Sequence, residues 1–530
     1  MQATADTAVA VTAPVHYVLA RPASVRLRAL LALAAGAVLA ASFAPLNLWP
    51  LAVLAPAVLM WLWQDATPRE AARLGFWFNF ATFAAGTYWL YISIHGFGGA
   101  PIWLAFALMF GLVGIMGLYH AALGYAVARW LPTRGALRWL VALPAAWLFV
   151  EWWRGWFLSG FSWLSLGYSQ TDSWLAAFAP LAGVYGISAL LLVCAGALTA
   201  LAYGGTRVRI IAAVTLLVPW GLGALLYRHS WTTPAGPPVT VAVVQGAIPQ
   251  DEKWQESNRE TTLNLYQSLT EKVLGAQLIV WPESAPADVA NDLVPYINNL
   301  YREARAHGSA IVMGVLRAEG DAQQPSAMRY YNSVLALGDQ QVSWYDKHHL
   351  VPFAEVFPVP SFVRSWLRLM SLPYSDFTAG AASQPPLPAA GLQLGATVCY
   401  EDAYGSSMLS VLPRADALVN VTNDAWFGHS SARHQHFQIA RMRALEAGRY
   451  MVRAANDGIS GVIGPHGEVI ARAPEFAPTT LVSKIVPLIG LTPYAHVGNW
   501  LVVSLATLAL AYAVWVRNDR GRSLPRDRSD

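Results

Sequence analysis

The chain has 530 residues, of which 55% are hydrophobic and only 12% are charged. Soluble globular proteins carry about 25% charged residues, so this composition excludes a protein that is soluble throughout. The formal net charge is +4, and neither a basic patch nor a Gly-rich phosphate loop stands out in the sequence. We therefore expect no nucleic-acid partner.

Seven apolar segments precede Arg228, and an eighth lies near the end of the chain. Most of them approach the roughly 20 residues that cross the hydrocarbon of a bilayer. No small-residue cleavage site follows a single apolar stretch at the N-terminus, so the first segment should remain as a helix. We predict eight transmembrane helices at about 27–44, 49–64, 74–94, 102–128, 137–153, 174–203, 208–227 and 494–516.

The composition changes between Pro238 and about Gly490. This stretch holds 23 of the 31 acidic residues and 18 of the 35 Lys and Arg, a net charge of −5, and the rest of the chain carries +9. About 250 residues are enough for a hydrophobic core of their own. We predict one soluble domain at 239–487, inserted between seven helices in 27–228 and the eighth.

Arginines mark one face of the membrane. Fifteen of the 17 arginines outside the insert lie before the first helix, after the eighth, or in every second loop between helices. Arg154 and Arg228 are the exceptions. Positive charge marks the cytoplasmic side. The tails 1–26 and 517–530 are therefore predicted to be cytoplasmic, and the insert periplasmic at a bacterial inner membrane.

Within the insert, β-rich runs alternate with stretches of helical spacing, and two hairpins are recognisable. This alternation predicts an α/β layered domain. "YGSSMLSVLPR" (404–414) is interpreted as a helix, and the Pro-rich "SQPPLPAAG" (383–391) as a surface loop.

Three polar residues follow predicted strands of the insert directly: Glu283 in "IVWPES", Lys347 in "WYDKHHLVPF" and Cys399 in "GATVCYE". A thiolate is the reactive form of cysteine, and a nearby ammonium lowers the thiol pKa. A carboxylate could take the thiol proton, and the lysine could hold an oxyanion. The other cysteine, Cys194, lies in the sixth apolar segment, so no disulfide is expected. From the residues alone, a surface lysine and a capping acid remain an alternative.

The order and spacing of these three segments resemble the carbon–nitrogen hydrolase (nitrilase) superfamily, whose catalytic set is Glu, Lys and Cys. Other segments narrow the resemblance to the apolipoprotein N-acyltransferase family: "FAPLNLWPLA", "GFSWLSLGYSQ", "GVYGISAL", "VQGAIPQDEKW" and "KHHLVPFAE". Two positions depart from that family's patterns. Ala354 replaces a usual Gly, and Ser162 replaces a usual Pro.

The resemblance implies a polytopic α-helical membrane protein with an inserted α-β-β-α sandwich. It also implies that Cys399 is the nucleophile, Glu283 the general base and Lys347 the oxyanion residue, with Glu355 supporting the lysine. Supporting or substrate-binding positions would be Tyr400, Glu401 and Trp254.

The implied reaction is a two-step acyl transfer. Cys399 would take an acyl chain from a phospholipid, typically phosphatidylethanolamine, as a thioester. The α-amino group of a diacylglyceryl-cysteine at the N-terminus of an apolipoprotein would then receive it. No cofactor or metal is implied, and a monomer is expected in the bilayer.

Some segments carry weaker signals. The apolar, Pro-bounded stretch 353–374 suggests a loop at the bilayer interface that admits acyl chains, or a buried loop. His429, His434 and His436 lack a recognisable fourth ligand and are interpreted as ordinary polar residues rather than a metal site. Glu446 is interpreted either as a support for the catalytic lysine or, preferably, as the partner of a neighbouring Arg.

Two rival functions remain at this stage. A membrane-tethered amidase or nitrilase would use the same three residues with water as the acceptor. A transporter or lipid-binding scaffold would retain the domain without its chemistry, and replacing Cys399 would separate these readings.

Overall fold

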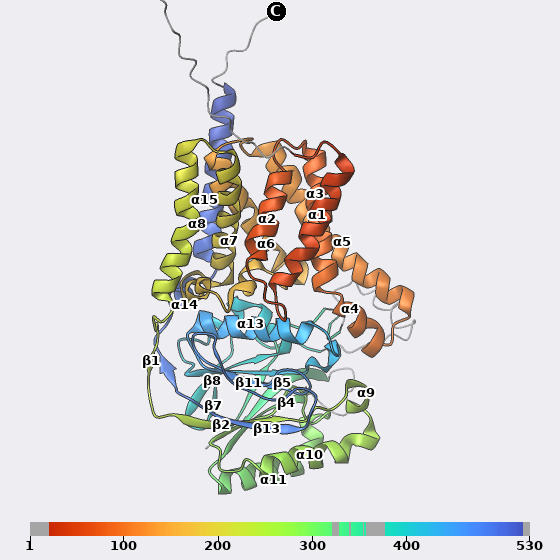
Figure 1. Cartoon of the computed structure of the whole chain (residues 1–530). Helices are drawn as coiled ribbons and strands as arrows, with labels where there is room; N and C mark the ends of the chain where they lie inside the picture. The colour runs from red at the N-terminus through yellow and green to blue at the C-terminus, as the bar shows by residue number, and fades with distance from the viewer. Residues whose placement is uncertain (1–20, 321–327, 339–340, 353, 357–376, 523–530) are drawn as a thin grey trace, which may run out of the picture.

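The computed structural model describes residues 21–320, 328–338, 341–352, 354–356 and 377–522. They form two halves (Figure 1). A bundle of long helices stands on one side, and an α/β domain built from the insert lies against one end of it. The first described residues, just before α1, and the last, at the end of α15, lie at the opposite end of the bundle.

The bundle holds helices from both flanks of the insert, since the last helix returns to pack on α6 and α7. Its long helices are α1 Val25–Leu39, α2 Leu51–Leu62, α3 Pro68–Gly86, α5 Ile102–Trp130, α6 Leu143–Arg154, α7 Ala179–Tyr203, α8 Thr206–Leu226 and α15 Trp500–Arg522. Short helical turns, including α4 Trp89–Tyr91, connect them.

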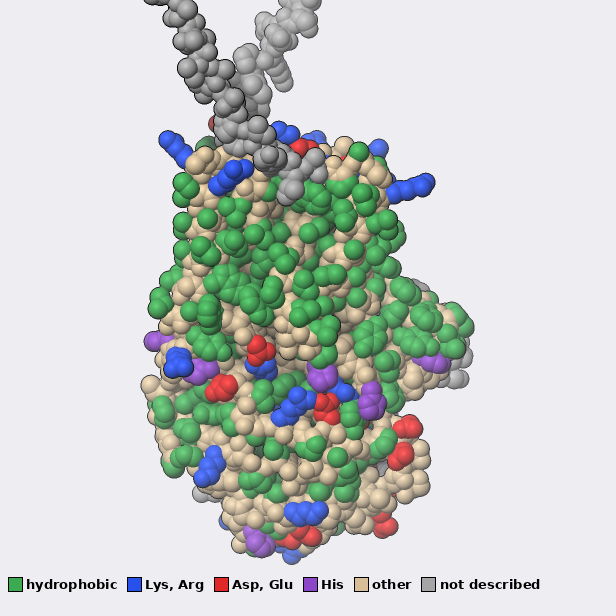
Figure 2. Space-filling view, viewed as in Figure 1, with side chains coloured by type: hydrophobic (Ala, Val, Ile, Leu, Met, Phe, Trp, Pro, Cys, Tyr) green, Lys and Arg blue, Asp and Glu red, His purple; other side chains and the backbone are tan. Residues whose placement is uncertain are grey.

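Five segments of the described chain are long and apolar enough to cross a membrane, where eight were predicted. They are Val25–Ser42, Ile102–Trp130, Trp174–Tyr203, Thr206–Leu226 and Trp500–Asp519. The helix α2 has only 12 residues, and α3 begins with three charged residues within its first six. Hydrophobic side chains cover the bundle surface, and Lys and Arg side chains gather at the end away from the α/β domain (Figure 2).

Two predicted helices are displaced along the chain. The third, expected at 74–94, is α3 at 68–86, because Thr67 caps its N-terminus and Pro68 occupies its first turn. The eighth, expected from 494, begins at Trp500. A short helix, α14 Pro493–Val497, ends at Gly498, whose φ of 56° belongs to the left-handed region and breaks the helix.

The α/β domain contains two six-stranded sheets. The first has the order β13-β2-β3-β4-β5-β6 and the second β12-β11-β10-β9-β8-β7. The strands of the first are β2 Val239–Gln245, β3 Leu278–Val280, β4 Ala310–Glu319, β5 Arg329–Leu337, β6 Val342–Asp346 and β13 Thr479–Ile485. Those of the second are β7 Leu387–Ala389, β8 Leu392–Val398, β9 Ala417–Thr422, β10 Met451–Ala455, β11 Gly461–Ile463 and β12 Val469–Arg472.

The two sheets pack face to face over a core rich in valine, including Val243, Val312, Val398 and Val452. On the outer face of the first sheet lie α10 Arg259–Glu271 and α11 Val294–Ala306. On the outer face of the second lies α13 Ala432–Ala447. The predicted helix–sheet–sheet–helix layering is thus present (Figure 1).

The helix α13 joins the two halves. Ala440 and Ala444 pack on the second sheet, whereas Ile439, Met442 and Leu445 belong to the core of the helical bundle. Its residues are buried almost throughout, because both of its faces are covered. The second sheet, which carries Cys399, is therefore the one nearer the bundle.

Two predictions within the insert were wrong. Residues 404–414 form only a short 3₁₀ turn, Gly405–Met408, and further turns, because Ser407 bonds the carbonyl of Tyr404 in place of helix continuation. The predicted surface loop 383–391 contains β7, which pairs with β8 across Ala390 and Gly391. Both of these turn residues have positive φ, as tight hairpins require.

Candidate active site

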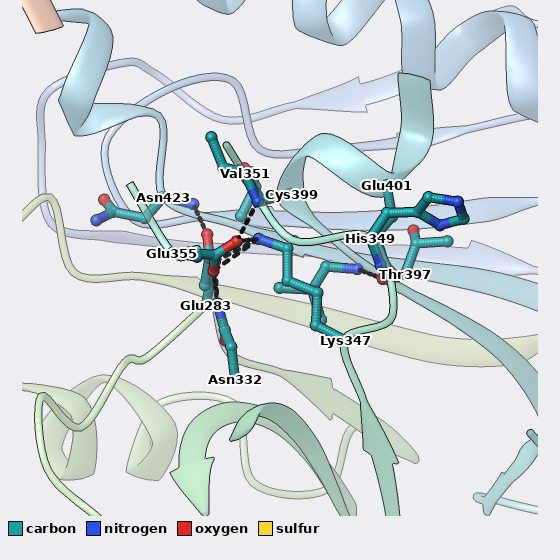
Figure 3. A network of polar contacts seen from close by, with 12 residues as sticks. Glu283, Asn332, Lys347, His349, Val351, Glu355, Thr397, Cys399, Glu401 and Asn423 are labelled. Carbon is teal, nitrogen blue, oxygen red and sulfur yellow. Dashed lines mark hydrogen bonds and ion pairs between the residues drawn. The ribbon is translucent and has the colours of Figure 1, made fainter. Parts of the chain in front are cut away.

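The three predicted reactive residues each follow a strand. Glu283 comes three residues after β3, Lys347 directly after β6, and Cys399 directly after β8. The first two belong to one sheet and the third to the other, so the site lies where the two sheets meet. The structure brings all three together (Figure 3).

Two carboxylates share one buried ammonium in what we name the lysine cluster: Glu283, Lys347, Glu355 and Asn332. Lys347 Nζ lies 2.9 Å from Glu355 Oε2 and 3.6 Å from Glu283 Oε1. The amide of Asn332 donates to both Glu283 Oε1 at 2.7 Å and Glu355 Oε1 at 2.8 Å (Figure 3). Lys347 is 1% exposed, against 8% for Glu283 and 9% for Glu355. Counted with both carboxylates ionised, the cluster carries an excess of one negative charge.

Backbone groups fix both carboxylates. The N–H of Asn423 donates to Glu283 Oε2 at 2.9 Å, and the N–H of Val351 donates to Glu355 Oε2 at 2.8 Å. These bonds come from different segments, β9 and the loop after β6. Each carboxylate is therefore held in position without help from substrate.

Burial and charge oppose each other at the lysine and the thiol. Burial alone would lower the pKa of Lys347, but Glu355 and Glu283 outweigh it and hold the lysine pKa above its usual range. Burial raises the pKa of the Cys399 thiol, as does Glu283, and Lys347 opposes them. In the resting site the thiol thus keeps its proton and the lysine its charge, so a base must act before the sulfur becomes a nucleophile.

Cys399 occupies a strained position. Its φ is 52°, in the left-handed region that a residue with a side chain rarely adopts. Glu401 fixes the surrounding chain, since its carboxylate accepts from the N–H groups of Val398, His348 and His349. Glu401 is fully buried and ties the strand that carries Cys399 to the segment that follows Lys347. Its contacts are those of an anchor between the two sheets.

The remaining predicted residues lie around the site. Tyr400 donates its hydroxyl to the carbonyl of Gly160 at 3.2 Å. Trp254 ends the short helix α9 Gln250–Lys253 and is half exposed. Glu446 pairs with Arg443 at 2.9 Å and accepts from the N–H of Val184, which confirms the expected pairing with a neighbouring Arg. Both cysteines are free, as predicted.

The predicted interfacial loop 353–374 lies outside the described residues except for 354–356. The three histidines of 429–436 occupy different surroundings. His429 stacks on Phe476, and His436 is buried against Asp424. Among the described residues, no group of three or more His, Cys, Asp or Glu is arranged to hold a metal ion.

Three residues of the site were missed from the sequence: Asn332, Asn423 and Lys253. Asn423 follows β9 as Cys399 follows β8, so the rule that found the other residues could have found it. Asn332 sits inside β5, where a single polar residue gives no signal. Lys253 donates to the backbone carbonyl of Glu283 at 3.0 Å, and burial lowers its pKa to about 8.

The helical half supports the turn that bears Cys399. Ser162 Oγ donates to the carbonyl of Ala403 at 2.8 Å, and Tyr404 donates to the carbonyl of Ser159 at 2.6 Å. The ring of Trp163 stacks on Tyr400 with 6.3 Å between centroids. The serine at position 162, which departs from the pattern noted in the sequence, thus makes a direct bond to the turn.

Comparison with known proteins agrees with both halves. Residues 35–197 match the family described as "Apolipoprotein N-acyltransferase N-terminal domain", and residues 240–494 match "Carbon-nitrogen hydrolase". An apolipoprotein N-acyltransferase of Methylococcus capsulatus is 40% identical over 90% of this chain and 94% of its own length. The chain belongs to the apolipoprotein N-acyltransferase family.

Relatives in other bacteria align over similar lengths. The apolipoprotein N-acyltransferase of Pseudomonas putida is 40% identical over 92% of this chain and 96% of its own. The apolipoprotein N-acyltransferase of Vibrio cholerae is 37% identical over 94% of this chain and 98% of its own length. Because membrane half and α/β half align together, the family resemblance covers the combination and not only the hydrolase-like domain.

Proposed function

We propose that this protein transfers an acyl chain from a phospholipid to the N-terminal diacylglyceryl-cysteine of apolipoproteins, through a thioester on Cys399. The observation that carries the proposal is the buried lysine cluster beside Cys399, in a chain whose other half is an apolar helical bundle. Both substrates are lipids or lipid-modified, so the site must lie close to a bilayer. The reaction is the one expected of a member of the apolipoprotein N-acyltransferase family that holds this buried site.

In the first step Glu283 takes the thiol proton, and the sulfur attacks the ester carbonyl of the phospholipid. Lys347 and the backbone N–H of Tyr400 stabilise the oxyanion of the tetrahedral intermediate. As the intermediate collapses, the leaving alkoxide takes the proton from Glu283. The products of this step are a Cys399 thioester and a lysophospholipid.

In the second step the neutral α-amine of the acceptor attacks the thioester carbonyl. Glu283 removes a proton from the nitrogen and returns it to the sulfur, which restores the thiol. Glu355 and Asn332 hold Lys347 and Glu283 in place through both steps. The excess negative charge of the lysine cluster suits a base that must accept a proton twice per cycle.

We further propose that the α/β domain faces the periplasm of a bacterial inner membrane, with both ends of the chain in the cytoplasm. The arginines at the far end of the bundle support this, since positive charge favours the cytoplasmic side. We propose phosphatidylethanolamine as the donor and a monomer as the working form, with eight helices, including short α2 and α6, in the membrane.

The test is intact-protein mass spectrometry after incubation with phosphatidylethanolamine, for the wild type and Cys399→Ser. The proposal predicts a mass gain of one acyl chain that neutral hydroxylamine removes and that the variant lacks. Adding a diacylated lipopeptide should discharge the adduct and yield a triacylated product. Discharge by water alone, with no product on the lipopeptide, would contradict the transfer and favour a membrane-tethered hydrolase.

A further inference from the structure

Four fully buried charged or titratable side chains lie behind Cys399 and form what we name the arginine cluster: Asp402, Asp424, Arg453 and His436. Each is at most 1% exposed. Arg453 lies between the two carboxylates, 3.4 Å from Asp402 Oδ2 and 3.0 Å from Asp424 Oδ2. The steps proposed above use none of these residues.

His436 connects this cluster to the main chain of Cys399. Its Nδ1 lies 2.8 Å from Asp424 Oδ1, and its Nε2 lies 3.1 Å from the carbonyl oxygen of Cys399. A carboxylate and a carbonyl can only accept hydrogen bonds. Both ring nitrogens must therefore donate, and only the positively charged imidazolium has two N–H groups.

Arg453 offers Nδ1 another arrangement, because its NH2 group lies 3.0 Å from that nitrogen. If Nδ1 accepted from Arg453, its lone pair would face the Asp424 carboxylate at 2.8 Å, and the two would repel. Asp424 also accepts from the hydroxyl of Thr422 at 3.0 Å and pairs with the guanidinium of Arg453 at 3.0 Å, so contacts other than His436 already favour its ionised form. The hydrogen therefore belongs on Nδ1.

With both carboxylates ionised, the charges of the cluster balance only if His436 is an imidazolium, although burial raises the pKa of Asp402 against the effect of Arg453 and His436. Two carboxylates face Arg453 and His436, and the other neighbours of the ring are the aromatic groups of Trp163 and Phe427. Without charge on His436, one buried carboxylate would lack a counter-ion, which costs several kcal/mol. Arg443, which also lowers the pKa of Asp402, is paired with Glu446.

We propose that His436 is a positioning residue whose imidazolium holds the strained backbone of Cys399 and places a fixed positive charge behind its sulfur. The bond to the Cys399 carbonyl keeps that residue at its positive φ, which directs the side chain toward the lysine cluster. The charge offsets Asp424, whose carboxylate raises the pKa of the Cys399 thiol. The inference rests on Cys399 being the nucleophile, as proposed above.

The test compares His436→Gln with His434→Gln, the same change two residues away on α13 at a half-buried ring outside the cluster. The readout is the rate of Cys399 alkylation by iodoacetamide across a pH series, in detergent and without lipid substrate. Cys194 is buried in the bundle, and Cys399→Ser gives the background. His436→Gln should slow alkylation roughly tenfold at a given pH and move its pH profile upward by about one unit. His434→Gln should match the wild type, and an unchanged profile in folded His436→Gln would overturn the proposal.

A second measurement tests the proposal if His436→Gln fails to fold. Nitrogen-15 spectra of histidine-labelled wild type at pH 8 should show one buried imidazole with both nitrogens protonated, and a neutral ring at every histidine would overturn the proposal. Alkylation requires no acyl donor, so the two proposals fail separately. A shifted profile with no acyl adduct would remove the proposed transfer only, and an adduct with an unshifted profile would remove the role of His436 only.

Discussion

The lysine cluster and the arginine cluster both bury charges beside Cys399, but they differ in balance and access. The lysine cluster has two carboxylates for one ammonium, and its carboxylates keep 8–9% of their surface exposed. The arginine cluster pairs two carboxylates with Arg453 and, in the proposal above, with the imidazolium of His436, and each of its members is at most 1% exposed. A group that exchanges protons with substrate needs spare negative charge and some access, whereas a group that fixes the backbone needs neither. The comparison supports the proposal that the lysine cluster takes part in the chemistry and that the arginine cluster holds the backbone.

A large effect is expected from Lys347→Met, which breaks the lysine cluster. Two carboxylates that share Asn332 would lose the ammonium that pairs with both, and the oxyanion would lose a charged donor. Acyl transfer should fall roughly 100- to 1,000-fold. The measurement is the rate of thioester formation in Lys347→Met. The control is Lys484→Met, the same change at an exposed lysine of β13. An equal loss of rate in both variants would refute the role of Lys347.

The arginine cluster is broken by Asp424→Asn, which leaves Arg453 and His436 short of one carboxylate. At neutral pH the free energy of unfolding of the variant should be about 3–5 kcal/mol lower than that of the wild type, because a buried charge loses its partner. The folded pKa of Asp424, about 2, lies below the ordinary value of 3.8. Its stabilisation is therefore present above pH 3.8 and lost as the pH falls through about 2.

Denaturant unfolding of wild type and Asp424→Asn between pH 7 and the lowest pH at which both fold checks this sign. The difference in the free energy of unfolding between the wild type and Asp424→Asn should narrow as the solution becomes more acidic. A gap that stays constant below pH 4 would mean that Asp424 is not held ionised by its partners.

Ser162→Ala should give the smallest effect. It removes one hydrogen bond from the helical half to the turn that bears Cys399, worth about 1 kcal/mol. We expect thioester formation to slow a few-fold with little change in the unfolding temperature. Loss of all activity would show that the loop 159–163 does more than brace the turn.

The sequence predicts the residues of the lysine cluster better than those of the arginine cluster, for a physical reason. Glu283 and Lys347 of that cluster each follow a predicted strand, as Cys399 does, so a reactive residue in that place is conspicuous. Asn332 lies inside a strand and was missed. Asp402, Asp424 and Arg453 come from separate elements, and their pairing depends on how the elements pack. His436 lies on a helix whose charged residues resemble a solvated face until the bundle and the sheet cover it.

The same limit applies to the helical half. Hydropathy indicates where the apolar segments lie, but the ends of α3 and α15 depend on Thr67 and Gly498, which are local capping and breaking residues. An α/β layered domain could be predicted from the alternation of strands and helices, whereas the sandwich of two sheets was implied by the family resemblance. The strand β7 could not, since its pairing depends on a turn of two residues with positive φ.

The central claim is that Glu283 takes the proton of Cys399, and the most direct test is the pH dependence of thioester formation in Glu283→Gln. The variant keeps the shape of the side chain and loses the base. Its rate at pH 7 should fall roughly 100- to 10,000-fold and then rise about tenfold per pH unit, because the thiol must ionise unaided. The wild type should change far less over the same range. A Glu283→Gln protein that forms the thioester at the wild-type rate at pH 7 would contradict the account.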